Sequence, residues 1–80
     1  MEFLVSLKEV EDVKEFVRLV SIYDCDILVK SQDKNFVVDG SSIMGVFSLD
    51  LSRPVVVSVK DIEAGTLFKN DIYKMIWNEK

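Results

Sequence analysis

The stretch that decides the predicted fold reads Ser42-Ile43-Met44-Gly45-Val46-Phe47-Ser48-Leu49. It predicts a short helix, and because successive residues advance by about 100° around a helix, Val46 and Leu49 are neighbours on one side. Met44 and Phe47 lie roughly opposite them. If Val46 and Leu49 point into a core, as a short helix over a sheet requires, then Met44 and Phe47, with Ile43 between them, form an exposed apolar patch. A small domain can also leave this much apolar area exposed without any function.

The residues around this helix predict its start and the strands beside it. Gly40 interrupts the chain ahead of the helix, and either Ser41 or Ser42 can cap it. Residues 55–59 contain four valines and are the strongest strand signal, and Pro54 fits the position before them, where no ladder donor is required. Three further strands are expected over residues 3–7, 27–29 and 36–38, the last two joined by a polar turn at 32–35.

Two longer helices are predicted from apolar residues at helical spacing. The first has acidic residues at its positive N-terminal end and this apolar stripe: Val10, Val13, Phe16, Val17 and Val20. The last helix is expected to start near Gly65-Thr66 and has this stripe: Phe68, Ile72, Met75 and Ile76. The predicted order is therefore βαββαβα in a single domain over residues 1–80. One-sided helices and strands of mixed pattern favour an α+β fold, in which an antiparallel sheet is covered by helices on one face.

Composition excludes several classes of function. The chain has 80 residues, of which 49% are hydrophobic and 30% charged, as expected for one small globular domain. One cysteine and no histidine leave no internal disulfide and no Cys/His zinc site. Without a basic leader or a long apolar run, we expect a cytoplasmic protein that does not enter the membrane. The net charge of −4 argues against nucleic acid as a partner.

Three segments carry a resemblance to a known family. Residues 42–49 closely resemble the serine-containing segment of the HPr (histidine phosphocarrier) proteins of the bacterial sugar phosphotransferase system. Tyr23-Asp24-Cys25-Asp26 resembles the end of their first helix, and the order of elements agrees from residue 2 to about residue 60. Residues 49–54 are similar to a group of HPr-related proteins of Gram-positive bacteria that lack the active histidine. The resemblance implies an open-faced β-sandwich, with three helices on a four-stranded antiparallel sheet.

The same resemblance places a catalytic histidine, followed by an arginine and a proline, at the start of the first helix. Here that region has no histidine, and the vacated site is marked by Glu9, Glu11 and Asp12. Carboxylates at this helix start would repel a phosphate, although they are also ordinary partners of the helix dipole. They could instead hold a cation, but the dipole interpretation is favoured and we predict neither a metal nor a cofactor. We therefore expect a protein that is not an enzyme.

The remaining expectations concern binding. In HPr proteins the surface of the short helix contacts enzymes and regulators, so the resemblance implies a regulatory adaptor that binds protein partners through Ile43, Met44 and Phe47. Ser42 matches the serine that an HPr serine kinase modifies in many Gram-positive bacteria, which makes it the phosphorylation candidate; from the residues alone, it is an N-cap. The alternative function is a structural module that self-associates through the patch or an edge strand, and the sequence leaves open whether the chain is a homo-oligomer.

Overall fold

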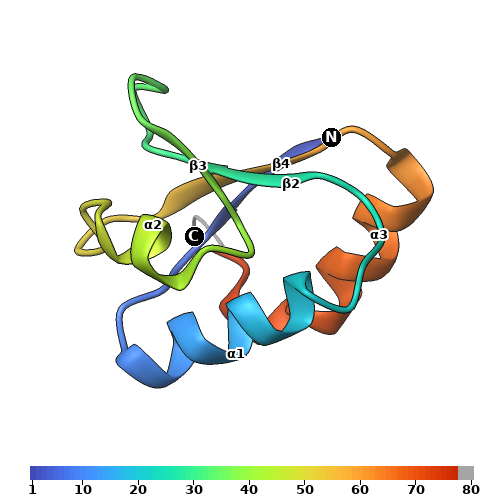
Figure 1. Cartoon of the computed structure of the whole chain (residues 1–80), viewed down its shortest axis with the longest axis horizontal. Coiled ribbons are helices and arrows are strands. Elements are labelled where there is room, and N and C mark those ends of the chain that lie inside the picture. The colour runs from blue at the N-terminus through green and yellow to red at the C-terminus, as the bar shows by residue number, and fades with distance from the viewer. Residues whose placement is uncertain (78–80) are drawn as a thin grey trace.

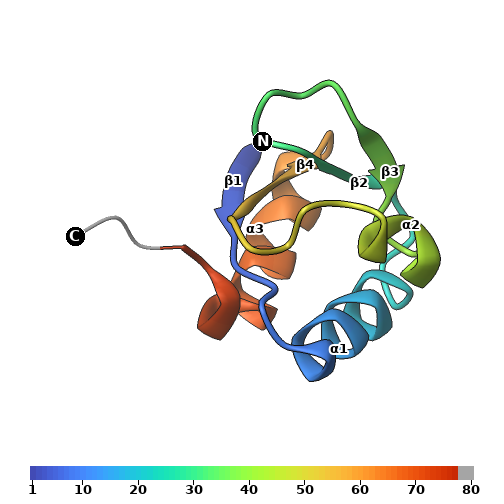
Figure 2. The same ribbon diagram turned by 90° about the vertical axis from the view of Figure 1, so that its left-hand side faces the viewer.

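The structure, a computed structural model, describes residues 1–77 and shows a four-stranded antiparallel sheet with its helices on one face (Figures 1 and 2). In chain order the elements are β1 (Glu2–Val5), α1 (Val10–Val20), β2 (Ile27–Lys30), β3 (Val37–Asp39), α2 (Ile43–Phe47), β4 (Val55–Val59) and α3 (Ile62–Asp71). A 3₁₀ turn, η1 (Tyr73–Met75), follows α3. The predicted α+β fold and its βαββαβα order are confirmed.

β4 lies inside the sheet, whose strand order is β1-β4-β2-β3. Its Val57 stands opposite Phe3 of β1 and opposite Val29 of β2. Four of the five residues of β4 are buried, as expected for a strand that is paired on both sides and covered by helices. The strand predicted at 55–59 is therefore confirmed. The strand predicted at 3–7 ends at Val5, and the one predicted at 36–38 lies one residue later.

α1 begins and ends where the sequence predicts, and it buries one side against the sheet. Val13, Phe16 and Val20 are buried, which is the helical spacing of the predicted stripe. Val10 is an exception, because its side chain is 54% exposed at the first position of the helix. The stripe that contacts the core therefore starts at Val13.

α3 corrects the prediction for the last helix. It begins at Ile62, three residues before Gly65, because Asp61 caps it: one carboxylate oxygen of Asp61 accepts the backbone N–H of Glu63 at 3.0 Å and that of Ala64 at 3.4 Å. The helix also ends earlier than predicted, at Asp71. Met75 and Ile76, expected on its last turns, therefore lie beyond the end of the helix.

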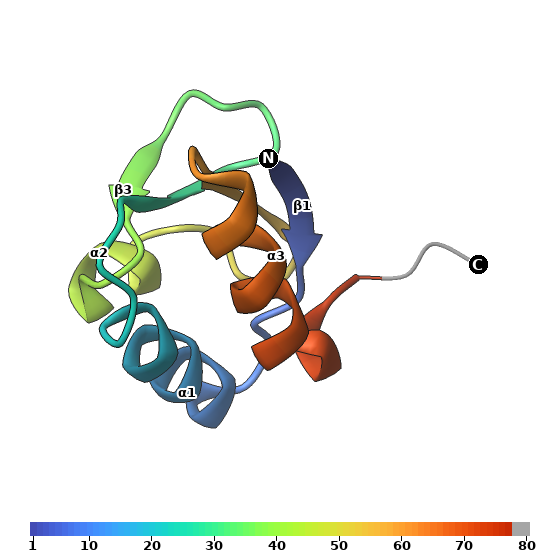
Figure 3. The ribbon, with the colours of Figure 1, turned by 90° about the vertical axis from the view of Figure 1, so that its right-hand side faces the viewer.

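Those residues form a C-terminal segment that covers the outer edge of β1. The backbone N–H of Ser6 donates to the carbonyl of Met75 at 2.7 Å, and the N–H of Trp77 donates to the carbonyl of Leu4 at 3.0 Å. Ile76 lies between these two bonds. Figure 3 shows the chain leaving α3 and turning toward the end of β1. Since an open sheet edge can pair with another chain, this segment protects one of the two edges.

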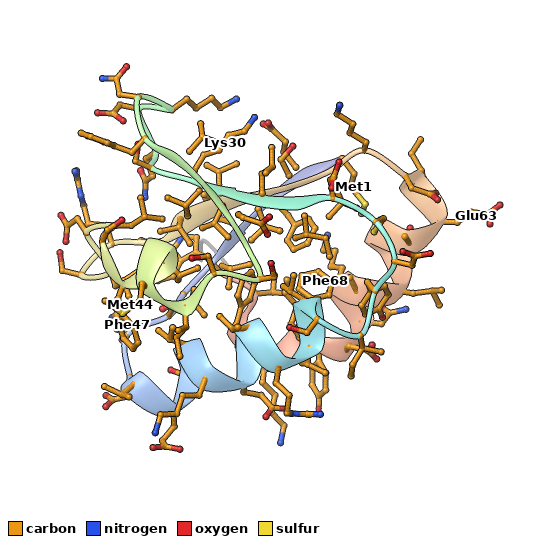
Figure 4. All side chains as sticks on the ribbon, in the orientation of Figure 1. Met1, Lys30, Met44, Phe47, Glu63 and Phe68 are labelled. Carbon is orange, nitrogen blue, oxygen red and sulfur yellow. The ribbon has the colours of Figure 1, made fainter. Side chains whose placement is uncertain are left out.

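The helices meet over the sheet around Phe68 of α3, which is fully buried and labelled in Figure 4. Its ring packs edge-to-face against Phe16 of α1, with centroids 5.6 Å apart, and against Tyr23, with centroids 5.3 Å apart. Edge-to-face packing is the favoured geometry for aromatic pairs, because the positive edge of one ring meets the negative face of the other. The aromatic cluster therefore joins α1 to α3.

Candidate functional site

α2 starts at a defined cap. The Ser42 hydroxyl oxygen accepts the backbone N–H of Gly45 at 3.1 Å, and the Ser42 N–H donates to the carbonyl of Asp39 at 3.0 Å. Ser41 bonds to Asp39 instead: its N–H and its hydroxyl both donate to the Asp39 carboxylate, at 2.9 Å and 2.7 Å. These two bonds hold the pKa of Asp39 below its usual value. Of the two serines that the sequence offers, Ser42 is the cap.

The two sides of α2 differ as predicted. Val46 is fully buried, and Leu49, just beyond the helix, is 8% exposed. Met44 is 77% exposed, Phe47 40% and Ile43 37%. We call Ile43, Met44 and Phe47 the α2 patch. Figure 4 shows Met44 and Phe47 together at the end of the molecule where α1 begins.

Gly45 lets α2 lie close to the sheet. A Cβ atom at this position would come within 3.2 Å of the Val38 Cβ in β3 and within 3.1 Å of the Ser42 hydroxyl oxygen. Both separations are tighter than an ordinary van der Waals contact, so a side chain here would require its neighbours to shift. Gly45 thus brings the buried side of α2 into the core and leaves the patch on the outer side.

The start of α1 carries the carboxylates of Glu9, Glu11 and Asp12. The Asp12 side chain accepts the backbone N–H of Glu9 at 3.3 Å, which satisfies a donor at the helix end. Glu9 and Glu11 are exposed. Within residues 1–77, no three histidine, cysteine or acidic side chains gather in a way that could hold a metal ion. Asp12 is thus a carboxylate of this group that bonds to the helix start.

The lone thiol offers no reactive site. Burial raises the pKa of Cys25, and the nearby carboxylates of Asp61, Asp26 and Asp24 raise it further. Only the thiolate is a strong nucleophile, so a raised pKa disfavours reactivity of this thiol.

One feature of the site is missed by sequence reasoning. The β2–β3 hairpin loop and the segment after α2 enclose a pocket of about 270 Å³, with Asp33 and Phe36 on one side and Leu49, Asp50 and Arg53 on the other. Both segments lie on the left of Figure 1, and both are on the side that faces the viewer in Figure 2. The sequence marks a polar turn at 32–35 and a resemblance at 49–54, but nothing in it brings the two together, because the pocket depends on how two loops are placed by the sheet.

Comparison with known proteins identifies the fold. No protein-family model and no curated protein matches the sequence. Among solved structures, HPr-C-His from Thermoanaerobacter tengcongensis aligns with a TM-score of 0.71 at 24% identity, over 100% of this chain and 99% of that one. The phosphocarrier protein HPr from Bacillus anthracis str. Ames aligns with a TM-score of 0.67 at 21% identity, over 94% of this chain and 93% of that one. The chain has the HPr fold.

This chain combines that fold with a short capped helix, α2, and it contains no histidine among its 80 residues. The open-faced sandwich that the resemblance implies is thus confirmed. In the part of the chain that the structure describes, no helix is long and apolar enough to cross a membrane.

Proposed function

We propose that this HPr-like chain is a non-catalytic regulatory adaptor of the bacterial phosphotransferase system, and that it binds a protein partner in the cytoplasm through the α2 patch. The observation that carries the proposal is the exposure of Met44 and Phe47 on a helix whose opposite side is fully buried. Met44 and Phe47 are also of the residue types, methionine and aromatic, that are enriched at the centre of protein interfaces.

The same proposal holds that this chain does not relay phosphate. The neighbour from Bacillus anthracis is named a phosphocarrier protein. The present chain contains no histidine, and its corresponding helix start carries Glu9, Glu11 and Asp12. An incoming phosphate would meet carboxylates instead of an imidazole, so we assign this chain no enzymatic role.

In this proposal, phosphorylation of Ser42 by an HPr serine kinase regulates the docking of the partner. The hydroxyl is exposed at the cap of α2, directly before the α2 patch. A phosphate there would keep oxygen acceptors near the Gly45 N–H and would add negative charge beside the patch. Such a group alters the recognition surface without removing the cap.

The docking claim is tested with Met44→Asp and Phe47→Asp in a crosslinking experiment in cell extract, with the bound protein identified by mass spectrometry. Ile62→Asp is the matched control, because Ile62 is 70% exposed on α3 and the substitution changes the net charge by the same amount. We expect the patch variants to lose the crosslinked partner and the control to keep it. A partner retained equally by all three variants would rule out docking at the α2 patch.

The kinase claim is tested by incubating the chain with HPr serine kinase and ATP, followed by mass spectrometry. We expect one phosphate on the wild type and on Ser41→Ala, and none on Ser42→Ala. An unmodified wild type beside a phosphorylated HPr control would reject the claim.

A second candidate function is self-association through β3. This strand lies at the edge of the sheet opposite β1, and its neighbouring apolar side chains are exposed, Phe36 by 66% and Val37 by 50%. Within residues 1–77 no segment pairs with its outer side, whereas the β1 edge is covered. Sedimentation velocity across a range of concentrations decides between the two: a dimer that Val37→Lys abolishes supports self-association, and a concentration-independent monomer excludes it.

A further inference from the structure

The pocket between the β2–β3 hairpin loop and the segment after α2 has the size of one side chain. Its volume is about 270 Å³, below the range of about 300–1,000 Å³ that is typical of pockets for drug-sized ligands. Leu49, which is 8% exposed, supplies an apolar surface, and the Phe36 ring, which is 66% exposed, stands at its rim. The pocket therefore offers an apolar floor and an accessible aromatic face.

Two carboxylates line this pocket, and both are held in place by neighbours. The Asp33 carboxylate accepts the Ser31 hydroxyl at 2.5 Å and the Asn35 backbone N–H at 3.0 Å. The Asp50 carboxylate accepts the hydroxyl and the backbone N–H of Ser52, at 2.5 Å and 3.1 Å. These bonds lower the pKa of both groups, so both are ionised at neutral pH.

A guanidinium from the chain itself already stands beside these carboxylates. Arg53 Nε lies 3.8 Å from Asp50 Oδ2, and its charge also lowers the pKa of Asp33. The contact is loose, and the Arg53 side chain remains 72% exposed. Among the pocket residues, one guanidinium faces two carboxylates, so the pocket keeps a net negative charge.

We infer that this pocket binds the guanidinium group of an arginine side chain presented by a protein partner. The arginine stem would cover Leu49, its planar head would meet Asp33 and Asp50, and one face of the head would lie against the Phe36 ring. Arginine fits better than lysine, because its planar group forms paired hydrogen bonds with carboxylates and stacks on aromatic rings. Arg53 is then an internal competitor for the same carboxylates.

This inference goes beyond the proposed adaptor function and does not require the α2 patch. The two surfaces are nevertheless joined along the chain, because Ser48, which lines the pocket, directly follows Phe47. A partner segment that covers the α2 patch could therefore also place an arginine in the pocket at the C-terminal end of α2.

The test is a chemical-shift titration of the full chain with N-acetylarginine amide at low ionic strength. We expect saturable shifts at Asp33, Phe36 and Asp50, and no saturable shift with the neutral analogue N-acetylcitrulline amide. Asp33→Asn and Asp50→Asn should each weaken binding by about two- to five-fold, as expected for exposed charge pairs. The spectra themselves show whether each variant is folded.

The decisive variant is Arg53→Gln, which removes the internal competitor. It should tighten binding of the arginine probe by about two- to five-fold. Lys60→Gln is the matched control, since it makes the same charge change at the opposite end of β4 and should leave the affinity almost unchanged. Equal effects of the two variants would show a general charge effect and overturn the inference. So would shifts spread over remote carboxylates such as Asp24 and Asp26, or a response to the citrulline probe equal to that for arginine.

Discussion

The aromatic cluster around Phe68 permits a quantitative prediction about what joins α1 to α3. Phe68→Leu keeps an apolar side chain at a fully buried position but removes both edge-to-face contacts, with Phe16 and with Tyr23. Each such pair contributes about 0.5–1.5 kcal/mol beyond its buried area. The incompletely filled space adds about 1 kcal/mol. We expect the free energy of unfolding to fall by about 2–4 kcal/mol.

This loss is large for a chain of 80 residues, whose total stability should be about 4–12 kcal/mol. Urea denaturation followed by circular dichroism measures it, and with a slope of about 1 kcal/mol per molar the midpoint should fall by about 2 M or more. Leu67→Ala is the control, because Leu67 adjoins Phe68 on α3 but is 60% exposed. Leu67→Ala should change the free energy of unfolding by no more than about 0.5 kcal/mol.

A double-mutant cycle separates the ring contact from simple burial. Phe16→Leu and Phe68→Leu together should cost less than the sum of the single changes, by about 0.5–1.5 kcal/mol. Additive effects would mean that the rings do not interact specifically. A Phe68→Leu protein as stable as Leu67→Ala would refute the assignment of Phe68 to the core.

Three further predictions follow from local geometry. Gly40→Ala should lower the free energy of unfolding in urea by about 1–3 kcal/mol, because its Cβ would lie 2.8 Å from the backbone oxygen of Ile27, to which Gly40 is hydrogen-bonded. Burial, followed by the hydrogen bond to Asp71, raises the pKa of Tyr23 from 10.0 to about 12. The unfolded state therefore ionises first, and stability should fall as the pH rises from about 10 to about 12; in Tyr23→Phe, urea titrations at each pH should show a smaller decline. Ser42→Ala should cost about 1 kcal/mol through loss of the α2 cap, seen as a thermal midpoint about 5 °C lower; an unchanged midpoint would contradict the cap.

The elements that the sequence predicts well are those with a strong local pattern. Residues 55–59 are rich in valine and become an inner strand with four of its five residues buried. The stripe from Val13 to Val20 becomes the buried side of α1. The opposition of Val46 to Met44 on α2 follows from the turn angle of a helix alone. In each case the residues within one element already determine which side faces the core.

The elements that it predicts poorly depend on contacts between distant segments. Met75 and Ile76 have helical spacing after Phe68, but they lie beyond the end of α3 and pair with the edge of β1 instead. Helical and extended conformations can both bury such apolar residues, and the open edge of β1 offers hydrogen bonds that a longer helix would not use. The earlier start of α3 did have a local signal, because aspartate is a favoured cap and Asp61 directly precedes the helix.

The length of α2 links its stability to its proposed role. A helix of five residues makes less than two turns, so its own backbone bonds cannot stabilise it and it depends on its cap and its buried side. Ser42 provides the cap, and Val46 provides the buried side. Met44 and Phe47 do not provide either contribution, and both expose apolar surface. The proposed partner would cover this surface, and it would explain apolar residues at positions where folding would accept polar ones.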